Sequence, residues 1–233
     1  MYPPSDTQRE FRGMEMASMT RINIGCGMTP TEGWMNLDNS PSLRLAKFPF
    51  LAEVLHRLGL LDGNQFDYVG YCRSNRIKFA DGTRRIPVPD GAAEVVYASH
   101  VIDLLDRTEI TLFLAEARRA LRPGGTLRIV VPDLGKLLSE YQRNHDADRF
   151  MANLMVCAPR ARTFAQRLRL LMVGDRMHKW AYDGRSLAKL LVECGFEDPA
   201  SLAPGETRIP DPGPLNLRER LEHHPLYMEA RRP

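Results

Sequence analysis

The residues of this chain best suited to chemistry lie at the ends of predicted strands. Gly25 and Gly27 bracket one small residue and follow a short β-branched strand over 21–24. Glycine has no Cβ, so such a loop brings main-chain N–H groups within hydrogen-bonding distance of a ligand. Asp38 ends a second short strand over 34–38. A carboxylate at that place can accept hydrogen bonds from both hydroxyls of a ribose.

The elements that must position these residues alternate between strand and helix. In chain order we expect a helix within 41–63, an irregular strand over 67–79, a strand over 94–98, a helix over 108–121, a strand after Gly125, helices over 133–141 and 183–194, and final strands near 199–207 and 225–230. This order indicates a parallel α/β sheet, on which the first helix should pack. The stretch 28–33 contains Pro30 and is too short for a helix, so a loop should cross to the second strand.

This pattern resembles the class I S-adenosylmethionine-dependent methyltransferases, in which a glycine-rich loop, an acid ending the second strand and a downstream Asp hold the cofactor. The chain is most similar to a compact bacterial group of that superfamily. The shared motifs are Gly25-Cys26-Gly27, Gly33-Trp34, Ser99-His100, His178-Lys179-Trp180-Ala181-Tyr182-Asp183, Arg218-Glu219-Arg220 and Pro225-Leu226-Tyr227-Met228-Glu229-Ala230. The resemblance implies a Rossmann-like three-layer α/β sandwich with a mostly parallel seven-stranded sheet and an antiparallel C-terminal strand.

The resemblance also implies S-adenosylmethionine as cofactor. Asp81 would accept from the adenine amine, while the amide of Ala80 or Gly82 donates to a ring nitrogen; Asp81-Gly82 can also be a plain turn. The methionine part would pass Ser99 and His100, and Ser99 can also cap a helix. The expected cofactor-binding residues are Asn23, Gly25, Cys26, Gly27, Asp38, Asn39, Ala80, Asp81, Gly82, Ser99 and His100.

Candidate catalytic residues lie later in the chain. Methyl transfer is an in-line displacement, so proximity and exclusion of water should supply most of the acceleration. A hydroxyl acceptor also needs a general base, for which His178 is the best candidate, although a lone histidine is more often structural. Asp133 could bind or deprotonate the acceptor or cap a helix, and Tyr182 shares the His178 motif. His223 and His224 have no third partner in view, so no metal is expected.

Length and composition favour one globular domain. Of 233 residues, 43% are hydrophobic and 26% charged, and no apolar run is long enough to span a bilayer. We expect a mobile tail over 1–19 and a methyltransferase domain over 20–233. A helical lid over 144–177, including the run Thr163–Val173, should cover the carboxyl edge of the sheet. Without a secretion signal or paired cysteines, a cytoplasmic location with free thiols is expected.

The sequence says least about the methyl acceptor. The resembling group favours a small molecule or a glycan sugar. A net charge of +3 is too small and too scattered to indicate nucleic acid, apart from the basic stretch 160–176. That basic stretch leaves RNA methylation as an alternative. A second histidine common in the group is replaced by Ile102-Asp103-Leu104 and the crossover is short, so a non-catalytic cofactor-binding protein is another alternative. A dehydrogenase is excluded, because Thr29-Pro30-Thr31 supplies no third glycine that opens a helix.

Overall fold

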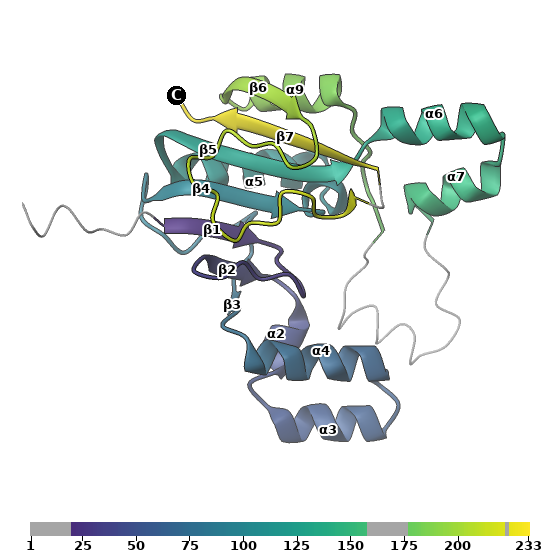
Figure 1. The fold of residues 1–233 in the computed structure, drawn as a ribbon. Helices are drawn as coiled ribbons and strands as arrows, with labels where there is room; N and C mark the ends of the chain where they lie inside the picture. The colour runs from purple at the N-terminus through teal and green to yellow at the C-terminus, as the bar shows by residue number, and fades with distance from the viewer. Residues whose placement is uncertain (1–19, 158–176, 222–223) are drawn as a thin grey trace, which may run out of the picture.

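The protein is built around one seven-stranded sheet. The computed structural model describes residues 20–157, 177–221 and 224–233. Its strands are β1 Thr20–Ile24, β2 Met35–Asp38, β3 Lys78–Phe79, β4 Ala93–Ser99, β5 Leu121–Pro132, β6 Glu197–Leu202 and β7 Pro225–Arg231. They lie in the order β3-β2-β1-β4-β5-β7-β6 (Figure 1). The first five run parallel, and β7 runs antiparallel to both of its neighbours. The predicted sheet, with its antiparallel C-terminal strand, is therefore confirmed.

The strand order reverses between β1 and β4. Consecutive strands spread outward from β1 in one direction up to β3, and the chain then returns to place β4 on the other side of β1. In open α/β sheets, ligands bind at the carboxyl ends of the strands where the order reverses. The glycine loop after β1 and the Ser99-His100 pair after β4 thus meet at the binding edge of the sheet.

Helices cover one face of this sheet. Helix α5 Arg107–Ala120 begins with a capping box, in which Asp106 and Glu109 each accept a backbone N–H of the other. Helix α9 Gly184–Glu193 begins the same way at Asp183. Their buried faces join one core with the strands, made of residues such as Ile22, Val96, Leu127, Phe113 and Leu187. The predicted helices over 108–121 and 183–194 are confirmed.

An irregular segment, residues 203–221, covers the other face. It crosses in front of β1, β4 and β5 in Figure 1. Its Ile209 and Leu215 pack with Trp34 and with the strand residues Tyr97 and Tyr227 in a second apolar cluster. Alternate strand residues point to opposite faces, so both faces of the central strands are buried. The third layer of the sandwich is therefore an extended segment in this protein.

A buried ion pair fixes that segment to the sheet. The Arg128 guanidinium on β5 and the Glu229 carboxylate on β7 are fully buried, with Nη1 and Oε1 2.6 Å apart. Arg128 also donates to the carbonyl oxygen of Glu206 at 2.9 Å. Glu229 accepts from the Thr207 hydroxyl at 2.6 Å and from the Arg208 amide at 2.7 Å. The pair thus bonds directly to the covering segment.

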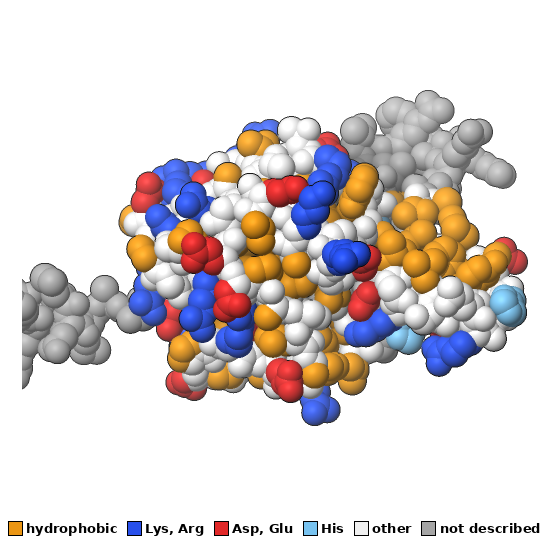
Figure 2. All heavy atoms as spheres, turned by 90° about the horizontal axis from the view of Figure 1, so that it is seen from above, with side chains coloured by type: hydrophobic (Ala, Val, Ile, Leu, Met, Phe, Trp, Pro, Cys, Tyr) orange, Lys and Arg blue, Asp and Glu red, His pale blue; other side chains and the backbone are white. Residues whose placement is uncertain are grey.

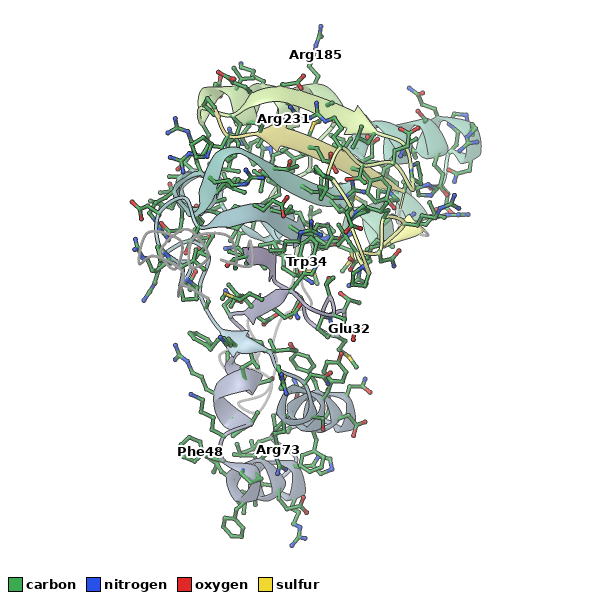
Figure 3. The ribbon with its side chains drawn as sticks, turned by 60° about the vertical axis from the view of Figure 1, so that its left-hand side comes forward. Glu32, Trp34, Phe48, Arg73, Arg185 and Arg231 are labelled. Atoms are coloured by element: carbon green, nitrogen blue, oxygen red, sulfur yellow. The ribbon has the colours of Figure 1, made fainter. Side chains whose placement is uncertain are left out.

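The chain between β2 and β3 forms three helices, α2 Pro41–Leu45, α3 Pro49–Arg57 and α4 Gly63–Ser74. They hang below the β3 edge, and Phe48 at their outer end is 61% exposed (Figures 1 and 3). The helix expected within 41–63 is confirmed but packs mainly on α4 rather than on the sheet. The strand expected over 67–79 is wrong except for its last two residues. Asp62 and Gln65 form a capping box that begins α4 instead.

Helices α6 Leu134–Asn144 and α7 Ala147–Leu154 follow β5 and stand beyond its carboxyl end (Figure 1). Asp133 caps α6 by accepting the Gly135 N–H at 2.9 Å, as predicted. Figure 2 shows apolar side chains gathered over these two helices, where Leu138, Met151 and Met155 are more than 40% exposed. The run Thr163–Val173 of the expected lid and the expected tail 1–19 lie outside the described residues.

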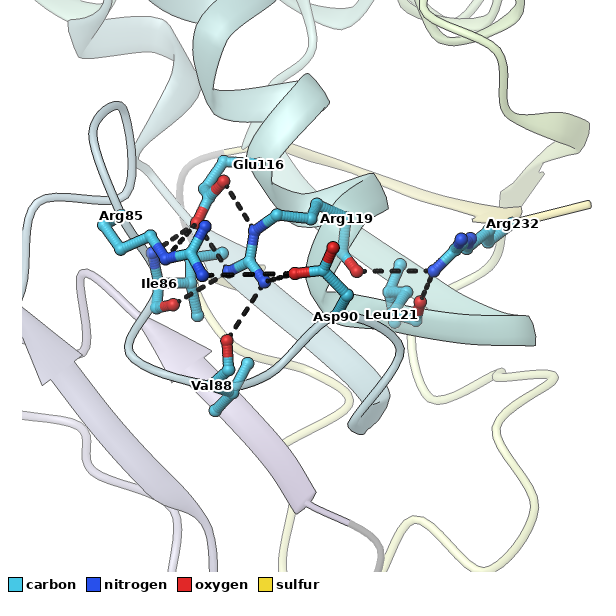
Figure 4. Close-up of polar contacts among 8 residues, drawn as sticks. All are labelled: Arg85, Ile86, Val88, Asp90, Glu116, Arg119, Leu121 and Arg232. Atoms are coloured by element: carbon cyan, nitrogen blue, oxygen red, sulfur yellow. Dashed lines mark hydrogen bonds and ion pairs between the residues drawn. The ribbon is translucent and has the colours of Figure 1, made fainter.

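Arg119 on α5 holds the loop that leads from β3 to β4. Its guanidinium pairs with Glu116 at 2.7 Å and with Asp90 at 2.6 Å, and donates to the carbonyl oxygens of Ile86 and Val88 (Figure 4). A planar guanidinium with five donors suits this many acceptors. The loop that carries Asp81 and Gly82 is thus fixed at its far end.

Candidate functional site

The glycine loop after β1 turns back on β2. Gly25 and Gly27 have φ of +68° and +49°, which favours glycine. The N–H groups of Gly25 and Cys26 donate to the Leu37 carbonyl oxygen at 2.8 and 3.2 Å, and that of Gly27 donates to Asp38 at 3.0 Å. These amides are therefore bonded within the protein in this structure, and their contact with a ligand stays a prediction. The glycines leave the loop free of side chains that would keep a ligand at a distance.

Asp38 lies at the carboxyl end of β2, where it was predicted, and is only 8% exposed. Its Oδ2 accepts the Gly27 N–H at 3.0 Å and its Oδ1 accepts the Ser40 N–H at 2.7 Å. A carboxylate has about four acceptor positions, so two remain for donors from a ligand. The neighbouring Asn39 is exposed and lines the adjacent cavity.

A small cavity opens at this edge of the sheet. Five of its lining residues were predicted to bind the cofactor, namely Gly25, Asn39, Ala80, Asp81 and Gly82. The sequence analysis missed the other five, Ile24, Thr83, Val101, Leu105 and Phe113. All of these except Thr83 are apolar, and no chemical motif marks an apolar wall. Only Ile24 and Thr83 had a signal in the sequence, because Ile24 is adjacent to the glycine loop and Thr83 lies two residues after Asp81.

The turn after β3 supplies a polar wall of the cavity. Asp81 Oδ1 accepts both the N–H and the hydroxyl of Thr83, at 3.0 and 2.7 Å, which leaves Oδ2 toward Arg84 at 3.4 Å. The Ala80 N–H donates to the Asp38 carbonyl oxygen at 3.0 Å. The Ala80 amide is therefore already bonded within the protein. Of the two amides expected to donate to a ring nitrogen of adenine, that of Gly82 is thus the better candidate. A Cβ on Gly82 would lie 3.1 Å from Phe113, so a side chain there would crowd this wall.

Asn23 and Cys26 were expected to bind the cofactor, and both are buried. The buried Asn23 amide donates to the Thr29 carbonyl oxygen at 3.1 Å and to the Thr31 hydroxyl at 3.2 Å, which fixes the crossover loop. That crossover has no helix, as predicted. The Cys26 thiol is also buried. Burial, with the charge of Asp38, raises the pKa of Cys26 to about 12, so it stays a thiol at neutral pH. All four cysteines are free.

Ser99 and His100 end β4 at the binding edge. His100 has a φ of +51°, and its N–H donates to the Val130 carbonyl oxygen at 2.8 Å. The 3₁₀ turn η1 Ile102–Leu104 follows after Val101, without a side-chain cap, so the N-cap considered for Ser99 does not form. Val101 and Leu105 line the cavity on either side of this turn. The turn that follows β4 therefore lies next to the cavity.

The turn η1 brings Asp103 against His178. The His178 Nε2 lies 3.1 Å from Asp103 Oδ2, and His100 Nδ1 lies 3.5 Å from the same oxygen. The other ring nitrogen of His178, Nδ1, lies 2.9 Å from the Leu154 carbonyl oxygen. The N–H groups of Lys179 and Trp180 donate to the Asp103 carbonyl oxygen. Both ring nitrogens of His178 therefore lie close to oxygen atoms of the protein, Nδ1 near Leu154 and Nε2 near Asp103.

Asp133 and Tyr182 pair through their backbones. The Asp133 carboxylate caps α6, so the capping role considered for it is realised. Tyr182 is 1% exposed within the main core, and burial raises the pKa of its phenol. The Tyr182 side chain thus lies in the core, close to the charges of Arg107 and Asp103, and neither Asp133 nor Tyr182 lines the cavity.

Comparison with known proteins agrees with this geometry. Residues 35–129 match the family model described as a methyltransferase domain. A structure of an S-adenosylmethionine-dependent methyltransferase from Methanosarcina mazei is similar over 100% of this chain and 98% of its own, at 14% identity and a TM-score of 0.50. One from Thermotoga maritima is similar over 95% of this chain and 85% of its own, at 15% identity and a TM-score of 0.47. No curated protein matches the sequence.

The fold and the matched domain define the class of the protein. The sheet is that of a Rossmann-like methyltransferase, and the matched segment runs from β2 into β5, across Asp38, the cavity turn and the end of β4. Residues 35–129 carry a methyltransferase domain, and the chain has the fold of the S-adenosylmethionine-dependent methyltransferase from Methanosarcina mazei to which it is similar. Among the described residues, no helix is both long and apolar enough to cross a membrane.

Proposed function

We propose that this enzyme methylates a hydroxyl of a small molecule or of a glycan sugar. The observation that carries the cofactor half of this proposal is the cavity at the strand-order reversal. Asp81 lines this cavity, and Asp38 precedes the lining residue Asn39 in the chain. Residues there fit S-adenosylmethionine, because two acceptor positions of the buried Asp38 carboxylate remain for the ribose hydroxyls. When bound, the cofactor supplies an electrophilic methyl group on a sulfonium.

The acceptor half of the proposal is supported by the surroundings of His178. Trp180 is 44% exposed, and Arg107 lies 4.8 Å from its ring centroid. Met155 and Val156, also exposed, follow the Leu154 carbonyl that holds His178. An exposed indole with apolar neighbours and a cationic group suits a ring that carries hydroxyls on one apolar face. This chain's own residues thus supply orientation and exclusion of water.

The ribose role of Asp38 predicts a measurable loss of cofactor affinity. Asp38→Ala should weaken binding of S-adenosylmethionine by about one to two decades, because a charged acceptor of hydrogen bonds is worth roughly 1.5 to 3 kcal/mol. Titration calorimetry with S-adenosylmethionine and its demethylated product measures this loss. Asp67→Ala is the matched control, since Asp67 is an exposed carboxylate on α4. Unchanged affinity in Asp38→Ala would remove the ribose role, and no binding to the parent protein would remove the cofactor site.

We also propose that His178 is a positioning residue on the acceptor side, acting through Asp103. Because its contacts are Asp103 and Leu154 rather than the cavity, His178→Asn should lower kcat by about a hundredfold while the Kd of S-adenosylmethionine stays within about threefold. Initial rates with an acceptor found by screening sugars and hydroxylated aromatics test this. His224→Asn, at an exposed contact with Glu140, is the control. A parental kcat, or a large loss of cofactor affinity, would contradict the assignment. Failure of every acceptor while the cofactor binds would instead favour the non-catalytic alternative.

A further inference from the structure

The cluster of His100, Asp103 and His178 offers more than positioning. One ligand atom from each residue lies within 4.8 Å of the other two. Asp103 is 1% exposed, and neither of its carboxylate oxygens accepts a hydrogen bond from the described part of the chain. A buried carboxylate without hydrogen bonds is costly unless a cation compensates its charge. Its nearest polar neighbours are the two imidazoles.

The hydrogen bond at the far side of His178 fixes the state of its ring. A carbonyl oxygen only accepts, so Nδ1, 2.9 Å from the Leu154 oxygen, must carry a proton. In the neutral ring Nε2 then holds its lone pair, directed into the cluster with Asp103 Oδ2 at 3.1 Å. Two lone pairs at that distance repel each other unless a proton or a metal ion lies between them. Histidine ligands of metal ions in proteins typically donate their other N–H to a backbone carbonyl in this way.

We propose that His100, Asp103 and His178 bind one divalent transition-metal ion at the carboxyl end of β4. Two imidazoles and one carboxylate are the ligand set of catalytic sites that keep open positions for water or substrate. Val101 and Leu105, on either side of Asp103 in the chain, line the cofactor cavity, so the site lies near that cavity. An ion held there polarises a coordinated hydroxyl oxygen, which suits the proposed acceptor. Metal binding itself does not depend on the proposed function.

No metal was expected from the sequence, because His223 and His224 have no third partner in view and the cysteines are not paired. His100 and His178 are far apart in the chain, and Asp103 stands in the Ile102-Asp103-Leu104 stretch where the resembling group carries another pattern. The backbone of residues 178–180 is fixed to the Asp103 carbonyl oxygen, with the Lys179 N–H donating at 2.7 Å. This backbone contact holds the third ligand in place without the ion. The site is thus built before the ion arrives.

Binding of Co²⁺ and Zn²⁺ to the full chain tests the site. The protein is stripped with a chelator, dialysed, and titrated with Co²⁺ while visible absorption is recorded; Zn²⁺ is then added in competition. We expect one ion per chain, visible bands that Zn²⁺ abolishes, and a higher melting temperature with Zn²⁺. Asp103→Asn and His178→Gln should each raise the Kd of Co²⁺ at least about a hundredfold, as loss of one of three ligands requires.

A control variant tests whether Co²⁺ binds at a histidine outside the cluster. His224→Gln removes an imidazole from an exposed contact with Glu140 and should leave the Co²⁺ Kd within about threefold. Melting of each stripped variant shows whether it is folded, so a failure to bind is not mistaken for unfolding. The proposal is overturned if the parent protein shows only the spectrum of hydrated Co²⁺, or if both cluster variants bind as the parent does. Because these measurements need neither cofactor nor acceptor, they stay independent of the methyltransferase assays.

Discussion

Replacing Gly25 by alanine should weaken binding of S-adenosylmethionine by about a thousandfold. A Cβ at this position would lie 2.3 Å from Val101 Cγ2, and the φ of +68° strains any L side chain. Val101 is β-branched and lines the cavity, so it cannot rotate away freely. The clash is relieved only if Val101 or the loop moves into the cavity, and about 4 kcal/mol of lost cofactor contacts corresponds to a thousandfold in affinity. Calorimetric titration of the folded variant measures the loss.

Gly27→Ala provides the matched control for that prediction. Its φ of +49° imposes a similar backbone strain, but an added Cβ would meet no atom within 4 Å. We expect Gly27→Ala to bind within about tenfold of the parent, with a loss of stability of about 1–2 kcal/mol. Equal losses of affinity in the two variants would show that strain alone matters and that the contact with Val101 does not shape the cavity.

Removing the charge of Glu229 should destabilise the fold by about 3–5 kcal/mol. Glu229→Gln leaves the fully buried Arg128 guanidinium without its counter-charge. The new amide also places a donor where the carboxylate accepted from Thr207 and from the Arg208 N–H. Denaturant unfolding followed by circular dichroism measures the change in the free energy of unfolding. Residues 203–221 depend on this pair, so their protection from hydrogen exchange should fall most.

Two further variants make the second prediction specific. Glu53→Gln breaks an exposed pair with Arg57 on α3 and should cost less than about 0.5 kcal/mol. The double variant Arg128→Met/Glu229→Met should be more stable than Glu229→Gln, because an apolar pair leaves no buried charge uncompensated. A double variant less stable than the single one would mean that the hydrogen bonds to the covering segment matter more than the charge.

The sequence predicted the sheet and the cofactor edge because both depend on local signals. Strands rich in β-branched residues, helices with an apolar period, and the glycines after β1 are visible within short windows. Asp38 was singled out for the same reason, since an acid that ends a strand beside a glycine loop needs no distant partner to be recognised. Two strands show the limit: that expected over 199–207 ends at Leu202, and that expected over 67–79 forms only at its last two residues. The apolar residues within 67–79 fit the spacing of a strand and that of a helix. The capping box of Asp62 and Gln65 begins helix α4 there.

Only the tertiary structure decided how distant residues meet. The Asp103 cluster joins the end of β4 to residue 178, and the Arg128–Glu229 pair joins β5 to β7; neither pairing has a signature in local spacing. The structure likewise shows that the glycine-loop amides are already bonded to Leu37 and Asp38. Local propensity follows from each residue's own backbone and side chain, whereas partners across the sheet follow from topology, which short windows of sequence do not contain.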